Sequence, residues 1–349
     1  MVEAFAKVKV AAVHAAPVFL NLEASVAKAS ELIEEAGRQG AGLIAFPEAY
    51  VPGYPFWIWS HTPAQSAPLF VELYANAVDL PSDATRRIGN AARKAGAWVV
   101  MGLNERVGGT LYNTLAYFDH QGRLVARHRK LQPTNVERTI WGRGDGTDVF
   151  VLDTPFGRLG GLICFEHTMD LNRYALTAMG QQVHVAAWPA ISAMTAVPNS
   201  SNFDNFSETA CKYHAMAGQA YVVCVQGRID RTIIERLDLG DQPDKIREGG
   251  GWSAIIGPDA RIITGPHRDE EKTIYGDIDL GVIPFAKFFA DSAGHYARPD
   301  VFSFGIDTRP QVPLAQPPIG PPNLIDDLAE PVPEPEQELS DQSGEGVVK

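Results

Sequence analysis

Cysteine is scarce in this sequence, which has only Cys164, Cys211 and Cys224 among its 349 residues. An odd and widely spaced set of cysteines does not form the kind of disulfide framework that holds small secreted domains together. Reduced thiols persist in reducing compartments. We therefore expect three free cysteines and a cytoplasmic location.

Basic charge and long apolar runs are also in short supply. The chain has 30 lysines and arginines against 42 aspartates and glutamates, which gives a net charge of −12. A general nucleic-acid binder needs a basic face to neutralise phosphates, so the charge argues against nucleic acid as a partner. No apolar stretch approaches the roughly 20 residues of a membrane-spanning helix, which argues against a membrane partner.

Strand and helix patterns alternate through most of the chain. The continuous apolar runs Ala41–Phe46 and Ala97–Leu103 predict strands that are covered on both faces. Asn21 and Gly40 are typical residues for the beginning and end of a helix. Hairpin signals, such as residues 119–122, interrupt this alternation. The pattern favours an α/β layered fold with a mixed sheet.

The last forty residues have a different composition. Residues 310–349 contain nine prolines and eight acidic residues against one lysine. Few apolar groups and strong charge repulsion favour disorder. We predict one domain over residues 1–309, followed by a disordered, proline-rich acidic tail over residues 310–349. An alternative is that Leu324, Ile325 and Leu328 dock on a neighbouring subunit.

Cys164 is a candidate nucleophile because of its position after a predicted strand. The apolar segment Leu159–Ile163 leads into it, and a polar segment and a predicted helix at Leu171–Met179 follow. Ligands of open α/β sheets bind at the carboxyl ends of strands. A thiolate at such a position is intrinsically reactive, although a lone buried cysteine is often inert packing.

Three charged residues lie at or near other predicted strand ends. Glu48 follows the strand that ends at Phe46, and a partly buried carboxyl group there can shuttle protons. Lys130 closes the predicted strand Leu124–Arg129, and its ammonium can lower the pKa of a thiol and stabilise a developing anion. Glu137 comes seven residues later and can hold that lysine in place.

The order of these residues resembles the Glu–Lys–Cys centre of the nitrilase branch of the carbon–nitrogen hydrolase superfamily. Glu48 precedes Lys130 by 82 residues, and Lys130 precedes Cys164 by 34. The resemblance covers about residues 6–305 and is carried by five segments, which are Phe46–Pro55, Arg129–Arg138, Cys164–His167, Ala187–Pro189 and His295–Phe302.

The resemblance implies a fold, a reaction and an assembly. The fold would be an αββα sandwich with mixed sheets, and the assembly a homo-oligomer built from dimers that can extend into a spiral. The reaction would convert a small-molecule nitrile into a carboxylic acid and ammonia through a thioimidate and a thioester on Cys164. Glu48, Lys130 and Glu137 would complete the catalytic centre, with no metal or organic cofactor.

Aromatic residues near the catalytic segments are candidates for the substrate pocket, because such pockets are largely apolar. They are Tyr54, Trp57, Phe165 and Trp188, although each could instead pack in the core or at an interface. Phe165 departs from the family pattern, which usually has tryptophan directly after the nucleophile. His167 is similar to the residue of bacterial and fungal nitrilases and of cyanide-degrading enzymes.

Three other functions remain open from the sequence. The same centre could hydrolyse cyanide, as a cyanide hydratase or dihydratase does, or an aliphatic amide. A catalytically silent filament-forming protein is the alternative outside enzymology. A metal site at Cys164, Glu166 and His167 is disfavoured, because no second cysteine–histidine cluster supplies the usual ligand set.

Overall fold

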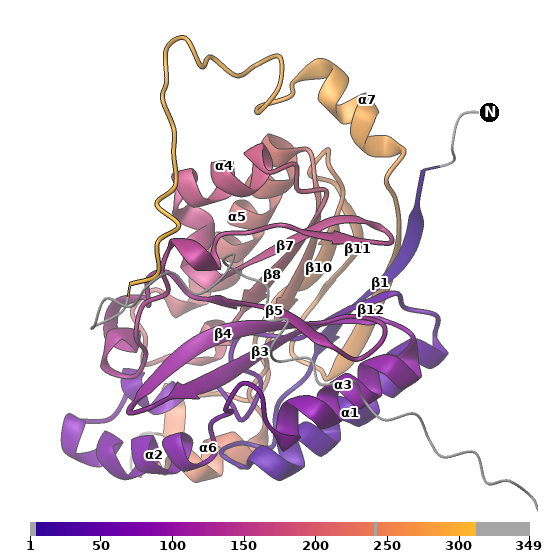
Figure 1. Ribbon diagram of the computed structural model, residues 1–349. Coiled ribbons are helices and arrows are strands. Elements are labelled where there is room, and N and C mark those ends of the chain that lie inside the picture. Colours follow the sequence, from indigo (N-terminus) through magenta and orange to yellow (C-terminus); the bar gives the residue numbers. More distant parts are fainter. Residues whose placement is uncertain (1–4, 241–242, 312–349) are drawn as a thin grey trace, which may run out of the picture.

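The structure, a computed structural model, describes residues 5–240 and 243–311. Within this part of the chain the strands form two six-stranded sheets (Figure 1). The strand order is β12-β1-β2-β3-β4-β5 in the first sheet and β11-β10-β9-β8-β7-β6 in the second. Almost all of the predicted acidic tail lies outside the described residues, so its disorder stays a prediction.

The first sheet is mixed. Its strands are β1 (Lys7–His14), β2 (Leu43–Ala45), β3 (Trp98–Val107), β4 (Thr110–Phe118), β5 (Leu124–Arg129) and β12 (Lys272–Asp279). Strands β1, β2 and β3 are parallel, and β12 pairs antiparallel with β1. Both β3–β4 and β4–β5 are antiparallel pairs, so β5 runs in the same direction as β2 and β3. The carboxyl ends of β2 and β5 therefore face the same edge of the sheet.

The second sheet repeats this plan. Its strands are β6 (Leu152–Thr154), β7 (Gly157–Ile163), β8 (Val183–Trp188), β9 (Tyr221–Gln226), β10 (Ser253–Ile256) and β11 (Ile262–His267). Strands β7, β8 and β9 are parallel, and the outer strands pair antiparallel. The central strands are completely buried and nearly continuous in apolar residues, as expected for strands covered on both faces.

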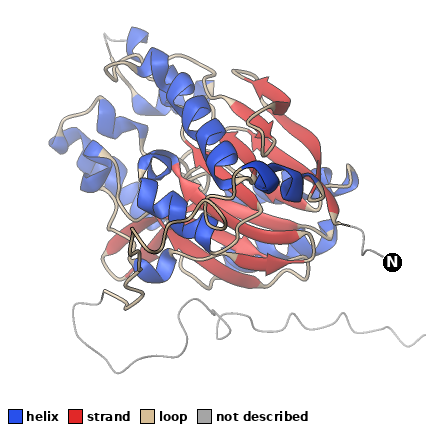
Figure 2. Ribbon diagram, turned by 90° about the horizontal axis from the view of Figure 1, so that it is seen from above, coloured by secondary structure: helices blue, strands red, loops and turns tan. Residues whose placement is uncertain are grey.

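Helices cover the outer faces of both sheets (Figures 1 and 2). The helices are α1 (Leu22–Arg38), α2 (Pro63–Ala75), α3 (Asp83–Ala95), α4 (Asp170–Ala178), α5 (Phe203–Gly218), α6 (Arg231–Leu237) and α7 (Val282–Phe289). Helices α1 and α3 lie on the first sheet, while α4 and α5 lie on the second. The αββα sandwich is thus confirmed, with the main core between the two sheets.

Local sequence explains the well-predicted elements. Asn21 caps α1 as predicted, since its side chain accepts a hydrogen bond from the Ala24 amide at 3.0 Å. The predicted strand Ala41–Phe46 is shorter than expected, because only Leu43–Ala45 pairs with both neighbouring strands. No helix in the described ranges is both long and apolar enough to span a bilayer.

Four elements were not predicted from the sequence, namely α2, α6, α7 and β12. Helix α2 was not predicted because it contains two prolines, Pro63 at its beginning and Pro68 in its interior. Pro63 is tolerated because it occupies the first turn, where its missing N–H would have no helical partner. Strand β12 pairs with β1, which lies more than 250 residues away in the sequence. A local pattern therefore could not predict it.

Candidate active site

Three strand ends and one short helix bring the predicted catalytic residues together. Glu48 follows β2, and Lys130 follows β5 directly. Cys164 begins a 3₁₀-helix immediately after β7, and Glu137 lies within the 3₁₀-helix Asn135–Thr139. The site therefore lies between the two sheets, at the carboxyl ends of strands in both of them.

Lys130 is at the centre of this cluster. Its Nζ donates to Oε1 of Glu48 at 2.8 Å and to Oε2 of Glu137 at 2.7 Å, and its side chain is completely buried. One carboxylate oxygen of each glutamate and the Cys164 sulfur lie within 4.8 Å of one another. Burial of an ammonium is costly unless it is paired, and here two carboxylates surround it.

Glu48 has one oxygen held and one oxygen free. Asn113 on β4 donates its Nδ2 to Oε1 at 2.6 Å, the same oxygen that Lys130 contacts. Oε2 is buried and has no hydrogen-bond partner. Burial raises the pKa of Glu48 to about 7, although the charge of Lys130 opposes this rise. A carboxyl group with such a pKa can accept and return a proton near neutral pH.

Gly102 allows the Glu48 segment to lie close to β3. A Cβ at this position would overlap the carbonyl oxygen of Pro47 and press on the amide of Ala49. The chain turns sharply here, and Ala49 has a positive φ of 50°. The close backbone approach therefore fixes where the Glu48 side chain begins.

Glu137 is held on both oxygens. Tyr54 donates its hydroxyl to Oε1 at 2.9 Å, and the backbone N–H of Thr134 donates to Oε2 at 2.7 Å. Trp59 in turn donates its indole N–H to the Tyr54 hydroxyl at 3.1 Å. Glu137 is thereby fixed as a rigid anchor for Lys130.

Cys164 adopts a backbone conformation that non-glycine residues rarely use. Its φ is +53°, in the left-handed region, which costs free energy for a residue with a Cβ. Burial, followed by the charge of Glu48, raises the pKa of the thiol well above its usual range. The Lys130 charge and the Phe165 backbone amide oppose that rise. The resting group is therefore a thiol, and it needs a base before it can attack.

Glu166 connects the Lys130 segment to the Cys164 segment. Its Oε1 accepts from the backbone N–H of Leu131, and its Oε2 accepts from that of Ile163, both at 2.8 Å. His128 also donates to Oε2 at 2.8 Å. Burial lowers the pKa of His128, but the charge and hydrogen bond of Glu166 together with those of Asp148 outweigh it and raise the pKa to about 9. A buried ion pair thus connects the residues next to Lys130 and Cys164.

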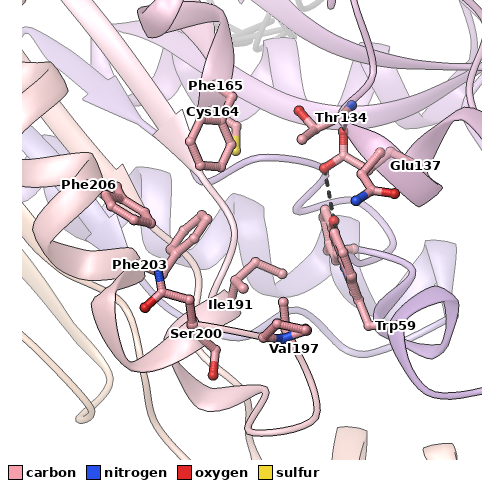
Figure 3. Close-up of a pocket in the computed structure, with 14 residues that line it drawn as sticks. Trp59, Thr134, Glu137, Cys164, Phe165, Ile191, Val197, Ser200, Phe203 and Phe206 are labelled. Carbon is pink, nitrogen blue, oxygen red and sulfur yellow. Dashed lines mark hydrogen bonds between the residues drawn. The ribbon is translucent and has the colours of Figure 1, made fainter.

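A cavity of about 250 Å³ opens next to the thiol (Figure 3). It is lined by Tyr54, Trp59, Thr134, Asn135, Glu137, Cys164, Phe165, Ile191, Val197, Pro198, Asn199, Ser200, Phe203 and Phe206. Tyr54 and Phe165 occupy the expected places. Trp57 and Trp188 do not line this cavity, which corrects the sequence-based placement. Both are completely buried, Trp57 against Phe19 and Trp188 stacked on His167.

Sequence reasoning missed several residues of the site. Asn113 lies in strand β4 between Tyr112 and Thr114, so its polarity did not distinguish it from its neighbours in the sequence. Phe203 and Phe206 are three residues apart at the beginning of α5, a spacing that places both on one helix face. Trp59 is two residues from Trp57, which was predicted to lie in the pocket, and nothing in the sequence distinguished the two tryptophans.

Two groups of side chains have the spacing of metal ligands among the described residues. One is Glu48, Glu137 and Cys164, and the other is His167, His184 and His214. In the first group the ammonium of Lys130 already occupies the space between the two carboxylates. Lys130 therefore occupies the position between the carboxylates that a metal ion would need.

The family model described as carbon-nitrogen hydrolase matches residues 9–288. The chain belongs to the carbon-nitrogen hydrolase family. An aliphatic nitrilase of Rhodococcus rhodochrous is 43% identical over 318 residues, covering 90% of this chain and 86% of that protein. A nitrilase of Bacillus sp. (strain OxB-1) is 39% identical, covering 89% of this chain and 91% of that protein.

Solved structures of this family share the fold. A carbon-nitrogen hydrolase from Helicobacter pylori G27 aligns with a TM-score of 0.70 at 17% identity, covering 85% of this chain and 97% of that chain. At this identity the likeness concerns the fold alone. The nitrilase-like resemblance inferred from the sequence motifs is confirmed by the family match and by the curated relatives.

Proposed function

We propose that this carbon-nitrogen hydrolase is a nitrilase that converts an organic nitrile into the carboxylic acid and ammonia, with Cys164 as the covalent nucleophile. One observation carries the assignment of roles. Glu48 has one buried oxygen without a hydrogen-bond partner and a carboxylate oxygen within 4.8 Å of the Cys164 sulfur, while Lys130 and Asn113 hold its Oε1. The names of the curated relatives support the choice of nitriles as substrates.

In the first half of the reaction Glu48 accepts the thiol proton, and the sulfur of Cys164 forms a bond to the nitrile carbon. The nitrile nitrogen takes up a proton, which gives a thioimidate. Lys130 and the backbone N–H of Phe165 lie where they can stabilise the charge that develops. Covalent catalysis divides one difficult hydrolysis into easier steps.

In the second half Glu48 takes a proton from a water molecule, whose oxygen adds to the thioimidate carbon. The tetrahedral adduct expels ammonia after proton transfer to nitrogen and leaves a thioester. A second water molecule then cleaves the carbon–sulfur bond, which releases the acid and restores the thiol. Two water molecules are consumed for each nitrile. Glu137 keeps the Lys130 ammonium in place throughout.

The cavity favours nitriles with an uncharged, apolar substituent. The side chains of Phe165, Ile191, Val197, Phe203 and Phe206 make most of the wall apolar. A volume of about 250 Å³ suits an aryl or branched alkyl group and would leave most of the space unfilled by cyanide. Glu137 is the one charged residue in the cavity wall and it already pairs with Lys130, so an ionised substituent would find no unpaired partner of opposite charge.

The decisive experiment measures ammonia, acid and amide released from an apolar nitrile, from its amide and from cyanide. We expect acid and ammonia from the nitrile, and no turnover by Cys164→Ala. Cys211→Ala is the matched control, because Cys211 is equally buried but lies on α5 away from the cavity wall. Turnover of the nitrile by Cys164→Ala would overturn the mechanism, and turnover of the amide alone would overturn the substrate.

We further propose a cytoplasmic homo-oligomer that is built from dimers. The three cysteines are free, which supports a reducing compartment. On α7 the side chains of Phe285, Phe288 and Phe289 are 61–76% exposed, which supports burial of this surface in an assembly. Light scattering should give a mass of at least two chains, and a fully active monomer would contradict the proposal.

A further inference from the structure

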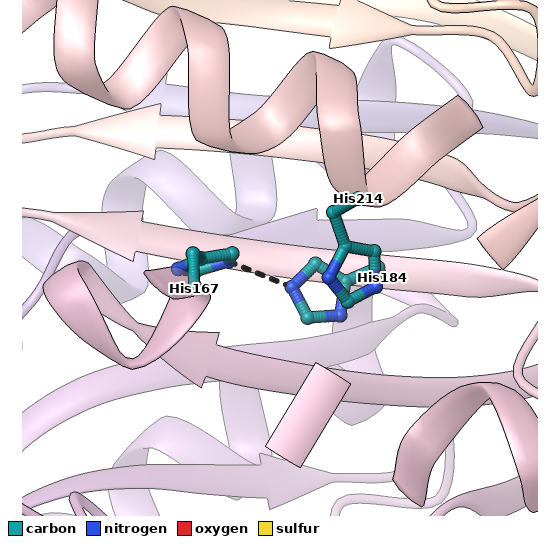
Figure 4. A group of neighbouring side chains, drawn as sticks. All are labelled: His167, His184 and His214. Carbon is teal, nitrogen blue, oxygen red and sulfur yellow. Dashed lines mark hydrogen bonds between the residues drawn. The ribbon is translucent and has the colours of Figure 1, made fainter. Parts of the chain in front are cut away.

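Three buried histidines lie behind the Cys164 segment and have no part in the chemistry described above. His167 belongs to the 3₁₀-helix Cys164–Thr168, His184 to β8 and His214 to α5 (Figure 4). All three are almost completely shielded from solvent. Buried polar groups are usually hydrogen-bonded, and five of the six ring nitrogens have partners here, Nδ1 of His214 being the exception.

The hydrogen bonds of these rings allow one assignment of protons. The carbonyl oxygen of Cys164 can only accept, so His167 donates from Nδ1 at 2.7 Å. A neutral imidazole has one N–H, so Nε2 of His167 accepts from Nε2 of His184 at 2.8 Å. The Nδ1 of His184 then accepts from the amide nitrogen of Gln181 at 2.8 Å. The amide oxygen of Gln181 accepts from Nε2 of His214 at 2.9 Å.

The chain of hydrogen bonds has a direction. It begins at His214, passes through Gln181 and His184, and ends at the backbone of Cys164. Neutral rings are required along its whole length. Burial is the main cause that lowers the pKa of all three histidines, and it brings that of His167 to about 4.

The surroundings keep this arrangement rigid. Trp188 stacks on the His167 ring with centroids 5.0 Å apart and planes 22° apart, and the rings of His184 and His214 stack at 3.7 Å. A Cβ at Gly160 would overlap the amide nitrogen of Gln181, so the glycine keeps the space for that side chain. Metal binding would compete with these bonds, because the lone pairs of His167 and His184 already accept hydrogen bonds.

We propose that His167 is a positioning residue for the nucleophile. Its N–H holds the Cys164 carbonyl and thereby the left-handed backbone that directs the thiol into the cavity. Gln181, His184 and His214 fix the tautomer in which His167 can donate. This inference rests on the proposed role of Cys164 as the nucleophile.

The first test compares His167→Leu, which removes the donor, with His167→Asn, whose amide N–H can replace it. In His167→Leu we expect kcat to fall by up to about 10²-fold with KM little changed, because the thiol is misplaced while the cavity persists. His167→Asn should recover a large part of kcat. Thr177→Val is the matched control, since it removes a different buried hydrogen bond, on α4.

A measurement on the unmodified protein keeps the proposal testable even if the variants fold poorly. Nitrogen NMR of labelled histidines should identify His167 as the Nδ1–H tautomer, and His184 and His214 as Nε2–H tautomers. An Nε2–H tautomer at His167, or wild-type kcat in His167→Leu, would overturn the positioning role. Loss of activity in Cys164→Ala shows separately that the nucleophile assignment stands, so the two failures are distinguishable.

Discussion

At the scale of single residues, the two glutamates beside Lys130 differ in how many of their oxygens are occupied. Oε1 of Glu137 accepts a hydrogen bond from Tyr54, and Oε2 accepts hydrogen bonds from both Thr134 and Lys130. Glu48 keeps one oxygen free within the buried site. Because a free oxygen is needed to receive a proton, this difference supports the proposed roles of Glu48 in proton transfer and of Glu137 as an anchor.

The pKa of Glu48 predicts the acid side of the pH–rate profile. Glu48 must be ionised to accept the thiol proton, and its pKa is raised to about 7. We expect kcat/KM to rise with pH through about 7 and then level off, because the pKa of Lys130 is raised well above its usual value and the ammonium stays charged. Steady-state kinetics measured across this pH range would locate the pH at which kcat/KM rises.

The Asn113 side chain offers a control for that assignment. Its hydrogen bond stabilises the ionised form of Glu48 and lowers the pKa. Asn113→Leu should therefore move the acid limb to higher pH, and Glu48→Gln should abolish activity at every pH. An acid limb that stays in place in Asn113→Leu would mean that another group controls it.

At the scale of elements, the site depends on how closely a loop packs on a strand. The Glu48 segment lies against β3 at Gly102, where a single methyl group would overlap the Pro47 carbonyl. Core positions of this kind respond to small increases in volume, because protein interiors are close-packed. The active site is therefore sensitive to a residue that contacts no substrate.

Gly102→Ala should lower both the stability and the activity. We expect a loss of about 1–3 kcal/mol in the free energy of unfolding, because the Glu48 segment must move away from β3. Denaturant unfolding and kcat measure the two effects. Gly109→Ala is the control, since a Cβ there meets no atom within 4 Å in the turn between β3 and β4. Equal stability of the two variants would contradict the packing argument.

At the scale of the whole molecule, burial of neutral histidines makes the fold sensitive to acid. His14 and His167 have pKa values lowered by burial to about 4, and those of His184 and His214 are lowered as well. Between their ordinary pKa of 6.5 and the folded value, the unfolded chain binds more protons than the folded one. Stability therefore falls as pH falls through this range.

We expect the free energy of unfolding to be clearly smaller at pH 5 than at pH 7. Each such histidine contributes about 1.4 kcal/mol per pH unit between its two pKa values. Glu48 and His128 act in the opposite direction, because their raised pKa values favour protonation of the folded state, but they are two groups against four. Chemical denaturation at both pH values measures the difference, and equal stability would contradict the assignment of neutral buried rings.

The sequence by itself determined the alternation of strands and helices and the order of the proposed catalytic residues. These are local properties, because apolar runs define strands and the motifs around Glu48, Lys130 and Cys164 are contiguous in the chain. The αββα layering followed from the resemblance and was confirmed by the structure. Even the free cysteines could be expected from their number.

Only the tertiary structure decided which side chains surround the reacting atoms. Asn113 contacts Glu48 across 65 residues of sequence, and His214 reaches the Cys164 segment through Gln181 and His184. Trp57 and Trp59 are equally aromatic in sequence, yet only Trp59 lines the cavity. Such contacts depend on strand register and on the packing of one sheet against the other, which no local pattern encodes.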